Sequence, residues 1–207
     1  MAPRKWAPER RRTELLQSAL VEFSTFGFGG ARVDRIAART NTNKAMLYQY
    51  FGSKEKLYVA VLEEVYADIR RAEAEIDFDA LQPKVAMERL IDFTFSYYVE
   101  HPEFVRIIGV ENQHGAAYLK QSPGIGALNV SIIRTLERIL VRGAEEGLFR
   151  SGIDPTGLYI CISALGFTYV TNCHTLETVF GRALMEPAAL KAHSQTMRAM
   201  VLGYVSP

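Results

Sequence analysis

Residues 33–51 read VDRIAARTNTNKAMLYQYF, and this stretch carries the clearest structural signal in the chain. Its apolar residues recur at helical spacing in two short runs, and Leu47 and Phe51 form the inward side of the second run. Ala37 is small enough to let two helices cross closely. Asn41 stands at the turn between them, where asparagine tolerates a left-handed backbone. The stretch therefore predicts two short helices joined by a tight turn.

The second of these helices, from Lys44 to Tyr50, presents a polar face. Its outward residues near the start are Lys44, Ala45, Tyr48 and Gln49. A short helix with such a face can enter the major groove of DNA, where it reads base edges and contacts phosphates. The next residues, Ser53-Lys54-Glu55-Lys56, predict the start of a long helix whose free amides, together with Lys54, form a phosphate site. The pattern predicts a DNA-binding helix-turn-helix.

Helical periodicity extends in both directions from this motif. An apolar stripe from Leu15 to Phe26 predicts a first helix, which a group of glycines ends, and Ser53 is placed to cap the long helix after the motif. Five more helices are predicted near residues 83–100, 103–119, 124–147, 155–179 and 187–204, with Pro83, Pro102, Pro123, Pro155 and Pro187 at or beside their first turns. Ser122 and Asp154 are placed as N-caps of two of them.

No stretch alternates apolar and polar residues for long enough to predict a strand, so the predicted fold class is all-α. We expect an N-terminal three-helix head in residues 1–56 and a larger helical body in residues 57–207.

The charge of the chain is distributed unevenly between these two parts. Residues 1–56 contain 11 Lys and Arg against 5 Asp and Glu, a balance of +6. Residues 57–207 contain 13 against 18, a balance of −5, so the two parts sum to the net charge of +1. A basic head on an acidic body suits a protein of which only the head contacts phosphates.

Several classes of protein are disfavoured by what the sequence lacks. The first residues, MAPRKWAPERRR, have no apolar core and do not form a secretory signal, and the apolar window 158–170 is too short to span a bilayer. Cys161 and Cys173 have no CxxC spacing, so a reducing cytoplasm is the expected location. No GxSxG, HExxH, Walker or GxGxxG pattern is present, so we expect no enzyme, no catalytic or metal-binding residue and no cofactor.

Three strings around the motif match a known pattern. They are Phe23-x-x-Phe26-Gly27-Phe28, then Ile36-Ala37, then Leu47-Tyr48-x-Tyr50-Phe51-x-Ser53-Lys54-Glu55-x-Leu57. Through them, residues 10–62 resemble the N-terminal domain of tetracycline-repressor-type (TetR family) regulators, and the last string is highly specific. The resemblance implies that Tyr48, Tyr50 and Lys54 hold the DNA backbone while Lys44 and Ala45 lie near bases.

Two positions depart from the pattern of that family. Asn41 stands where the family usually has glycine, and Arg32 stands where it usually has Thr or Ser, which loses a cap but allows Arg32 to reach a phosphate. The predicted DNA-binding residues are Arg32, Asn43, Lys44, Ala45, Tyr48, Gln49, Tyr50 and Lys54. The tail residues Arg4, Lys5 and Arg10–Arg12 form either a flexible arm on the DNA or a solvated charge run.

Bodies of TetR-type proteins are said to hold an effector cavity, and this body offers suitable residues. Apolar walls with a few convergent polar groups suit a small organic molecule, although aromatic residues at helical spacing are also ordinary core. Glu111 indicates a ligand with a donor or a positive charge, or else it pairs with Arg106 on its own helix. The predicted effector-binding residues are Phe93, Tyr97, Glu111, Asn112, His114, Tyr169 and Asn172.

The last two predicted helices favour a homodimer. Residues 158–170 are apolar almost all round, so one face can pack on the body while the other awaits a partner. In the TetR family the equivalent helices form a four-helix seam, which implies Leu158, Ile162, Leu165, Tyr169, Met197 and Val201 as interface residues. A two-fold dimer would place two recognition helices on successive major-groove faces of a near-palindromic operator.

These features together predict a cytoplasmic transcriptional regulator with no membrane contact. The favoured function is a repressor that a small organic effector releases from its operator. The alternative is an architectural or activator protein that binds DNA without control by a small ligand.

Overall fold

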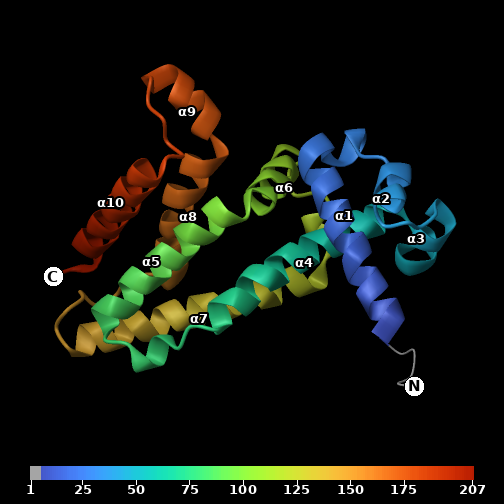
Figure 1. Ribbon diagram of the computed structural model, residues 1–207. Helices are drawn as coiled ribbons and strands as arrows, with labels where there is room; N and C mark the ends of the chain where they lie inside the picture. Colours follow the sequence, from blue (N-terminus) through green and yellow to red (C-terminus); the bar gives the residue numbers. More distant parts are fainter. Residues whose placement is uncertain (1–5) are drawn as a thin grey trace. The chain divides into compact units, whose positions relative to one another are not determined.

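The computed structural model describes residues 6–207 and shows ten α-helices and two short 3-10 helices in that range, with no strand (Figure 1). The all-α prediction is therefore confirmed. The helices are α1 (Trp6–Gly30), α2 (Val33–Arg39), α3 (Lys44–Phe51), α4 (Lys54–Ala74), η1 (Phe78–Ala80), α5 (Pro83–Glu100), α6 (Pro102–Gln113), η2 (Leu119–Gln121), α7 (Pro123–Glu145), α8 (Pro155–Thr171), α9 (Cys173–Phe180) and α10 (Pro187–Val205).

The helix predicted over 103–119 ends early, at Gln113. Gly115 and Ala116 take left-handed backbone conformations, with φ of 64° and 58°, which no α-helix accommodates. The chain then turns so that the amides of Tyr118 and Leu119 both donate to Glu111 Oε1, at 2.7 and 2.8 Å. The prediction was wrong here because apolar spacing continued past a turn that a single buried carboxylate stabilises.

The helix predicted over 155–179 is two helices, α8 and α9, separated at Asn172. The backbone of Asn172 (φ −104°, ψ 12°) leaves the helical region, and its Nδ2 donates to Thr168 O at 3.0 Å. An asparagine side chain that bonds to nearby backbone offers the chain an alternative to the helix. The start of α8 is as predicted, because Asp154 accepts hydrogen bonds from the amides of Thr156 and Gly157. The hydroxyl of Ser122, the other predicted cap, donates to Glu63 Oε1 at 2.6 Å.

The described chain forms two compact units, one of residues up to 68 with 106–126 and one of residues 69–105 with 127–207. The prediction of a boundary between residues 56 and 57 stays a prediction. In the first unit, α1, α2 and α3 pack side by side (Figure 1). Gly27 (φ 64°) breaks α1. Just after this break Phe28 joins an aromatic cluster with Tyr58 and Tyr118, whose ring centroids lie 5.3 and 4.5 Å from that of Phe28.

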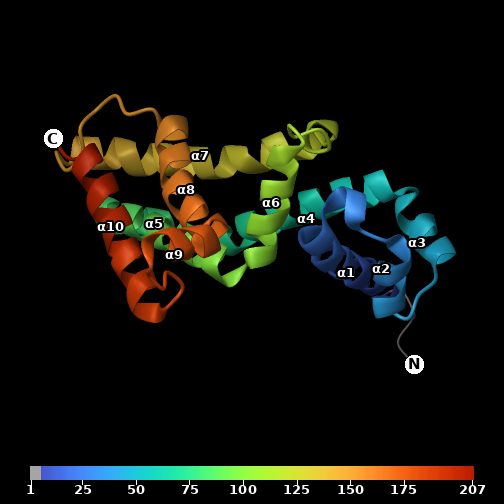
Figure 2. The same cartoon turned by 90° about the horizontal axis from the view of Figure 1, so that it is seen from above.

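In the second unit, α5 packs against both α8 and α10 (Figure 2). Gly166 of α8 permits this approach, since a Cβ there would lie 3.2 Å from Tyr98 and 3.3 Å from Phe95 of α5. On the side of α10, Asp92 accepts a hydrogen bond from Ser194 at 2.9 Å and forms an ion pair with Arg198. The contact of α5 with α8 and α10 is therefore held by apolar packing and by a partly buried charge pair.

The end of α7 supplies a test of this packing. A Cβ on Gly143 would overlap the ring of the buried Phe149, whereas a Cβ on Gly126, in the same helix, would meet nothing within 4 Å. We expect Gly143→Ala to lower the free energy of unfolding by about 1–3 kcal/mol through overpacking. Gly126→Ala should leave it unchanged or raise it by up to about 1 kcal/mol through helix propensity. Urea denaturation measures both, and equal effects of the two substitutions would contradict the described packing.

Candidate functional site

The turn between α2 and α3 has the left-handed residue that the sequence predicts, since Asn41 has a φ of 49°. Asn43 also caps α3 by accepting a hydrogen bond from Met46 N at 2.8 Å, a role that the sequence analysis did not assign to it. Leu47 and Phe51 are buried and anchor α3 to the core. One face of α3 is therefore fixed to the protein and the other is free to meet a ligand.

A buried carboxylate that the sequence analysis did not select holds α2 in place. The side chain of Glu22 has no exposed surface and accepts hydrogen bonds from Arg32 N at 2.9 Å, Arg35 Nε at 2.7 Å and Arg39 Nη1 at 2.9 Å. Burial alone would raise the pKa of Glu22, but the hydrogen bonds from these groups outweigh it and lower the pKa. A carboxylate three residues after the buried Ala19, on the apolar stripe of α1, is the signal that could have revealed it.

The outward face of α3 and its surroundings carry most of the predicted DNA-binding residues. Arg32, Asn43, Lys44, Ala45 and Gln49 are exposed, and Tyr48, Tyr50 and Lys54 are half-buried. Lys44 Nζ lies 3.7 Å from the exposed carboxylate of Asp34, so a weak surface ion pair would compete with any phosphate for this ammonium. The structure thus brings the predicted residues onto α3, its N-cap and the starts of α2 and α4.

The start of α4 has the geometry of a phosphate site. Ser53 accepts a hydrogen bond from Lys56 N at 3.2 Å, as predicted for the cap. Lys54 Nζ lies 4.7 Å from the centroid of the Phe28 ring, and this cation–π contact holds the ammonium beside the first turn of α4.

The predicted tail residues divide between two parts of the chain. Arg10–Arg12 lie within α1, where Arg11 donates to Thr40 O at 2.8 Å, so they are no flexible arm. Arg4 and Lys5 lie outside the described residues.

Three of the predicted effector residues belong to the first unit. Glu111 is buried, and its Oε1 accepts the two hydrogen bonds from backbone amides described above. Arg106, the alternative partner predicted for this carboxylate, is exposed. The Tyr58 hydroxyl is buried, and burial and the Glu111 carboxylate raise the pKa of Tyr58. Asn112 and His114 are exposed.

The other four predicted effector residues belong to the second unit. Phe93 and Tyr97 pack together on α5 with ring centroids 5.9 Å apart, and Asn172 is exposed at the break between α8 and α9. Tyr169 donates its hydroxyl to Leu184 O at 2.9 Å and stacks on His193 at 3.8 Å. Of these four, Tyr169 lines the groove between α8 and α10.

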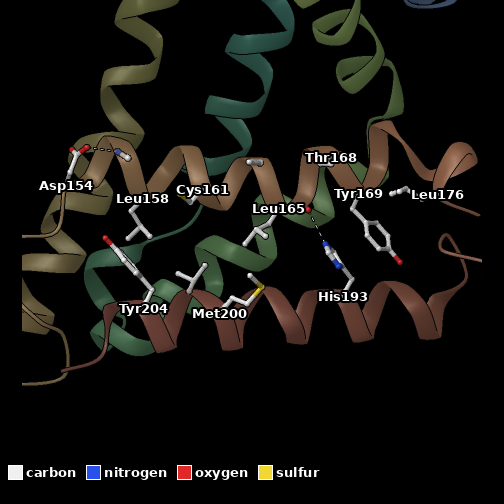
Figure 3. Close-up of a pocket in the computed structure, with 13 residues that line it drawn as sticks. Asp154, Leu158, Cys161, Leu165, Thr168, Tyr169, Leu176, His193, Met200 and Tyr204 are labelled. Carbon is white, nitrogen blue, oxygen red and sulfur yellow. Dashed lines mark hydrogen bonds between the residues drawn. The ribbon is translucent and has the colours of Figure 1, made fainter. Parts of the chain in front are cut away.

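That groove has a volume of about 860 Å³ and is open to one side. Figure 3 shows Leu165, Met200 and Tyr204 between the two helices, with His193 near Leu165 O at 3.1 Å. It is lined by Asp154, Gly157, Leu158, Cys161, Ala164, Leu165, Thr168, Tyr169, Leu176, His193, Met200, Val201 and Tyr204. Ile162 and Met197, which were predicted at the dimer interface, have no exposed surface within the single chain, so the free surface of α8 and α10 lies elsewhere.

A buried polar cluster in the second unit was missed by sequence reasoning. Arg70 and Glu73 of α4 form an ion pair, with Arg70 Nη1 and Glu73 Oε2 3.0 Å apart, and their side chains are only 8% and 7% exposed. Arg70 Nη2 also donates to the hydroxyl of Tyr159 of α8 at 2.8 Å. Glu73 follows the buried Ile69 by four residues, so a charge on the apolar stripe was again the available signal.

This cluster lines a second cavity, of about 340 Å³, between the end of α4, the η1 segment and α7. Arg70 Nε and Glu73 Oε1 are buried and make no hydrogen bond, whereas Arg70 Nη1 is engaged in the ion pair. Burial raises the pKa of Glu73 to about 7, against the lowering effect of Arg70. Buried polar atoms of this kind need a partner.

Neither metal chemistry nor a membrane span is indicated by the described part of the chain. Among those residues, no group of three or more His, Cys, Asp or Glu side chains is placed to hold a metal ion. No helix among them is long and apolar enough to cross a membrane.

Two family models match the sequence over most of its length. One, described as bacterial regulatory proteins of the tetR family, matches residues 15–61. The other, described as a tetracyclin repressor-like C-terminal domain, matches residues 83–201. The head and the body therefore match models of the same kind of protein.

Known proteins of similar sequence and structure agree with these models. The transcriptional repressor NicS of Pseudomonas putida is 38% identical over 181 residues, which cover 87% of this chain and 85% of NicS. The putative transcriptional regulator SCO4942 of Streptomyces coelicolor superposes with a TM-score of 0.70 at 24% identity, covering 94% of this chain and 97% of that one. The regulator FadR of Bacillus subtilis, solved in complex with stearoyl-CoA, superposes with a TM-score of 0.71 at 18% identity, covering 93% and 98%.

The buried carboxyl of Glu73 predicts a distinctive dependence of stability on pH. Since the folded-state pKa of about 7 exceeds the unfolded value of 4.5, the folded chain binds the extra proton between these values. Wild-type stability should therefore fall as the pH rises through this window, by roughly 3 kcal/mol in total, and level off above it. Glu73→Gln should lack this loss and be more stable than the wild type at pH 8.

Urea denaturation from pH 5 to pH 8 measures this difference. Glu75→Gln, at an exposed position two residues further on, should keep the wild-type profile. Parallel profiles for Glu73→Gln and the wild type would show that Glu73 is not the titrating group.

Proposed function

Because this chain belongs to the TetR family of bacterial regulatory proteins, we propose that it is a transcriptional repressor which a small organic effector releases from its operator. The observation that carries this proposal is α3, a capped helix with one face anchored in the core and the other exposed. The basic balance of +6 in residues 1–56 supports binding to phosphates. Binding to chromosomal DNA favours the cytoplasm as the place of action.

In this proposal α3 enters the major groove, and the residues around it contact the DNA backbone. Lys44, Ala45 and Gln49, which lie on the exposed side of α3, face the bases. The amides at the start of α4 bind a phosphate together with Lys54, and Arg32 and Asn43 bind neighbouring phosphates. Tyr48 and Tyr50 add hydroxyl groups to the same backbone contacts.

We further infer that the groove between α8 and α10 receives a second copy of the chain. Its apolar rim is exposed, with Met200 56% and Tyr204 54% accessible, and Ile160 beside it is 62% accessible. Cys161, Ala164 and Leu165 line the groove from the side of α8. A two-fold pairing there would give two copies of α3 for a near-palindromic operator.

The effector of this proposal binds in the body and shifts the balance between two shapes of the dimer. Only a molecule that binds one shape better than the other can change operator affinity, and the effect is reciprocal. An opposing effect of about 2 kcal/mol would weaken operator binding roughly thirtyfold.

The DNA contacts can be tested with an operator selected from a random-sequence pool by the wild-type protein. Lys54→Met keeps the apolar stem over Phe28 and removes the charge, so it should lower the slope of log affinity against log salt by about one. Tyr48→Phe should weaken binding roughly tenfold or more through loss of one hydrogen bond to a charged group. Fluorescence anisotropy measures both quantities.

The matched control is Lys84→Met, at an exposed lysine of α5 in the second unit. It should leave the affinity and the salt slope at wild-type values. Wild-type binding by both Lys54→Met and Tyr48→Phe, with unchanged circular dichroism, would remove these side chains from the interface.

The dimer can be tested by placing a charge in the groove. Ala164→Arg would bury a guanidinium between the two copies at a cost of several kcal/mol, so the variant should sediment as a monomer at micromolar concentration. Ala38→Arg, at an exposed alanine of α2, makes the same change in the head and should remain a dimer. A dimeric Ala164→Arg protein would place the interface elsewhere.

A further inference from the structure

We propose that Arg70 and Glu73 bind the carboxylate group of a small organic acid, with Tyr159 positioning Arg70, and that Glu73 takes up a proton when the acid binds. This inference rests on the proposed function, because it names the chemical class of the effector.

The cluster has the unused hydrogen-bonding capacity that a ligand would satisfy. Arg70 and Glu73 are more than nine-tenths buried, yet Arg70 Nε and Glu73 Oε1 make no hydrogen bond. A buried polar group without a partner costs about 1–3 kcal/mol, and more when it is charged. Since both side chains line the cavity of about 340 Å³, a molecule in that cavity can reach them.

The chemistry of the cluster favours an anion over a cation. Arg70 Nε, which has no partner, is a guanidinium donor, and guanidinium is the group best matched to a planar carboxylate. The Tyr159 hydroxyl accepts the hydrogen bond from Arg70 Nη2 and so fixes the position of the guanidinium. A carboxylate in the cavity would thus meet the Arg70 guanidinium of α4.

The ionisation of Glu73 decides how that anion is accommodated. The carboxyl of Glu73 forms an ion pair with Arg70. Because its pKa is about 7, only part of the Glu73 population is ionised near neutral pH and balances the guanidinium charge. When a ligand carboxylate takes over Arg70, a second ionised carboxylate in the same site is disfavoured. An ionised Glu73 therefore takes up a proton from solvent, and its carboxyl O–H donates a hydrogen bond to a ligand oxygen. The positive charge of this proton balances the negative charge of the ligand, so the total charge in the cluster is unchanged.

The other charged groups around the cavity are already engaged or exposed. Asp77 accepts a hydrogen bond from Ala80 N at 3.2 Å, and Asp79 of η1 forms an ion pair with Arg138 of α7 at 3.1 Å. Glu75 is exposed. The remaining lining residues are Ala74, Ile76, Phe78, Ser131 and Thr135, which present apolar surface and two hydroxyls to the organic part of the acid.

Benzoate and its neutral isostere benzamide are the probes, because they differ in the carboxylate alone. Titration calorimetry of the full-length protein should show benzoate binding that weakens roughly eightfold from pH 7.5 to pH 8.5, as expected for one proton taken up by a group with a pKa of about 7. Repeating the titration in buffers of different ionisation enthalpy should give close to one proton per benzoate bound at pH 8.5. Benzamide should bind more weakly, with no dependence on pH.

Two variants assign the effect to the cluster. Glu73→Gln already carries a neutral donor, so it should bind benzoate with the same affinity at both pH values and take up no proton. Arg70→Met should bind benzoate at least tenfold more weakly. Arg70→Met alone leaves the buried Glu73 carboxyl without its ion-pair partner. The double variant Arg70→Met with Glu73→Leu removes that group as well, and it should lose benzoate affinity to the same extent while keeping a native circular dichroism spectrum.

Operator binding by the apoprotein is measured separately, by anisotropy, so the two proposals fail in different ways. No benzoate binding at millimolar concentration, or binding that survives in the double variant, overturns the carboxylate site and leaves the operator assignment standing. Loss of operator binding on adding benzoate to the wild type, but not to the double variant, supports the site as the effector site.

Discussion

A charge can be buried in an all-α protein only where hydrogen-bond donors surround it, and Glu22 is the charge on which the N-terminal unit depends. Its oxygens are bonded by an amide before α2 and by two guanidinium groups on α2, so α2 is fixed to α1. Residues 40–43 then join α2 directly to α3, whose exposed face follows from that attachment. Without a partner for this carboxylate, the exposed face of α3 would lose its orientation and the unit would lose stability.

Local chemistry was sufficient to predict the helices around the motif. Asn41 and Ser53, and Asp154 further along at the start of α8, act at the backbone within a few residues of their own positions, so the adjacent sequence predicts their effects. The same holds for the exposed face of α3, because anchoring residues and exposed residues alternate at a fixed spacing. The fold class and most helix boundaries follow from such features.

The remainder depends on contacts between distant segments, which spacing does not encode. α8 is apolar nearly all round, so the spacing of its apolar residues did not predict which side is buried. In the structure Ile162 faces inward and Ala164 lines the groove. The end of α6 depends on Glu111 bonding to amides seven and eight residues later. Arg70 and Tyr159 are 89 residues apart, and no pattern in either segment indicates their contact.

The proposed pairing through the open groove between α8 and α10 has a consequence for the stability of the protein at low cellular concentration. A chain that covers this apolar surface only by pairing is stabilised by mass action, so its melting temperature rises with its own concentration. Newly made chains would be the most exposed to unfolding and to proteases before they meet a second copy. Turnover would then remove single chains faster than pairs, and the cellular level of the regulator would respond more than proportionally to its rate of synthesis.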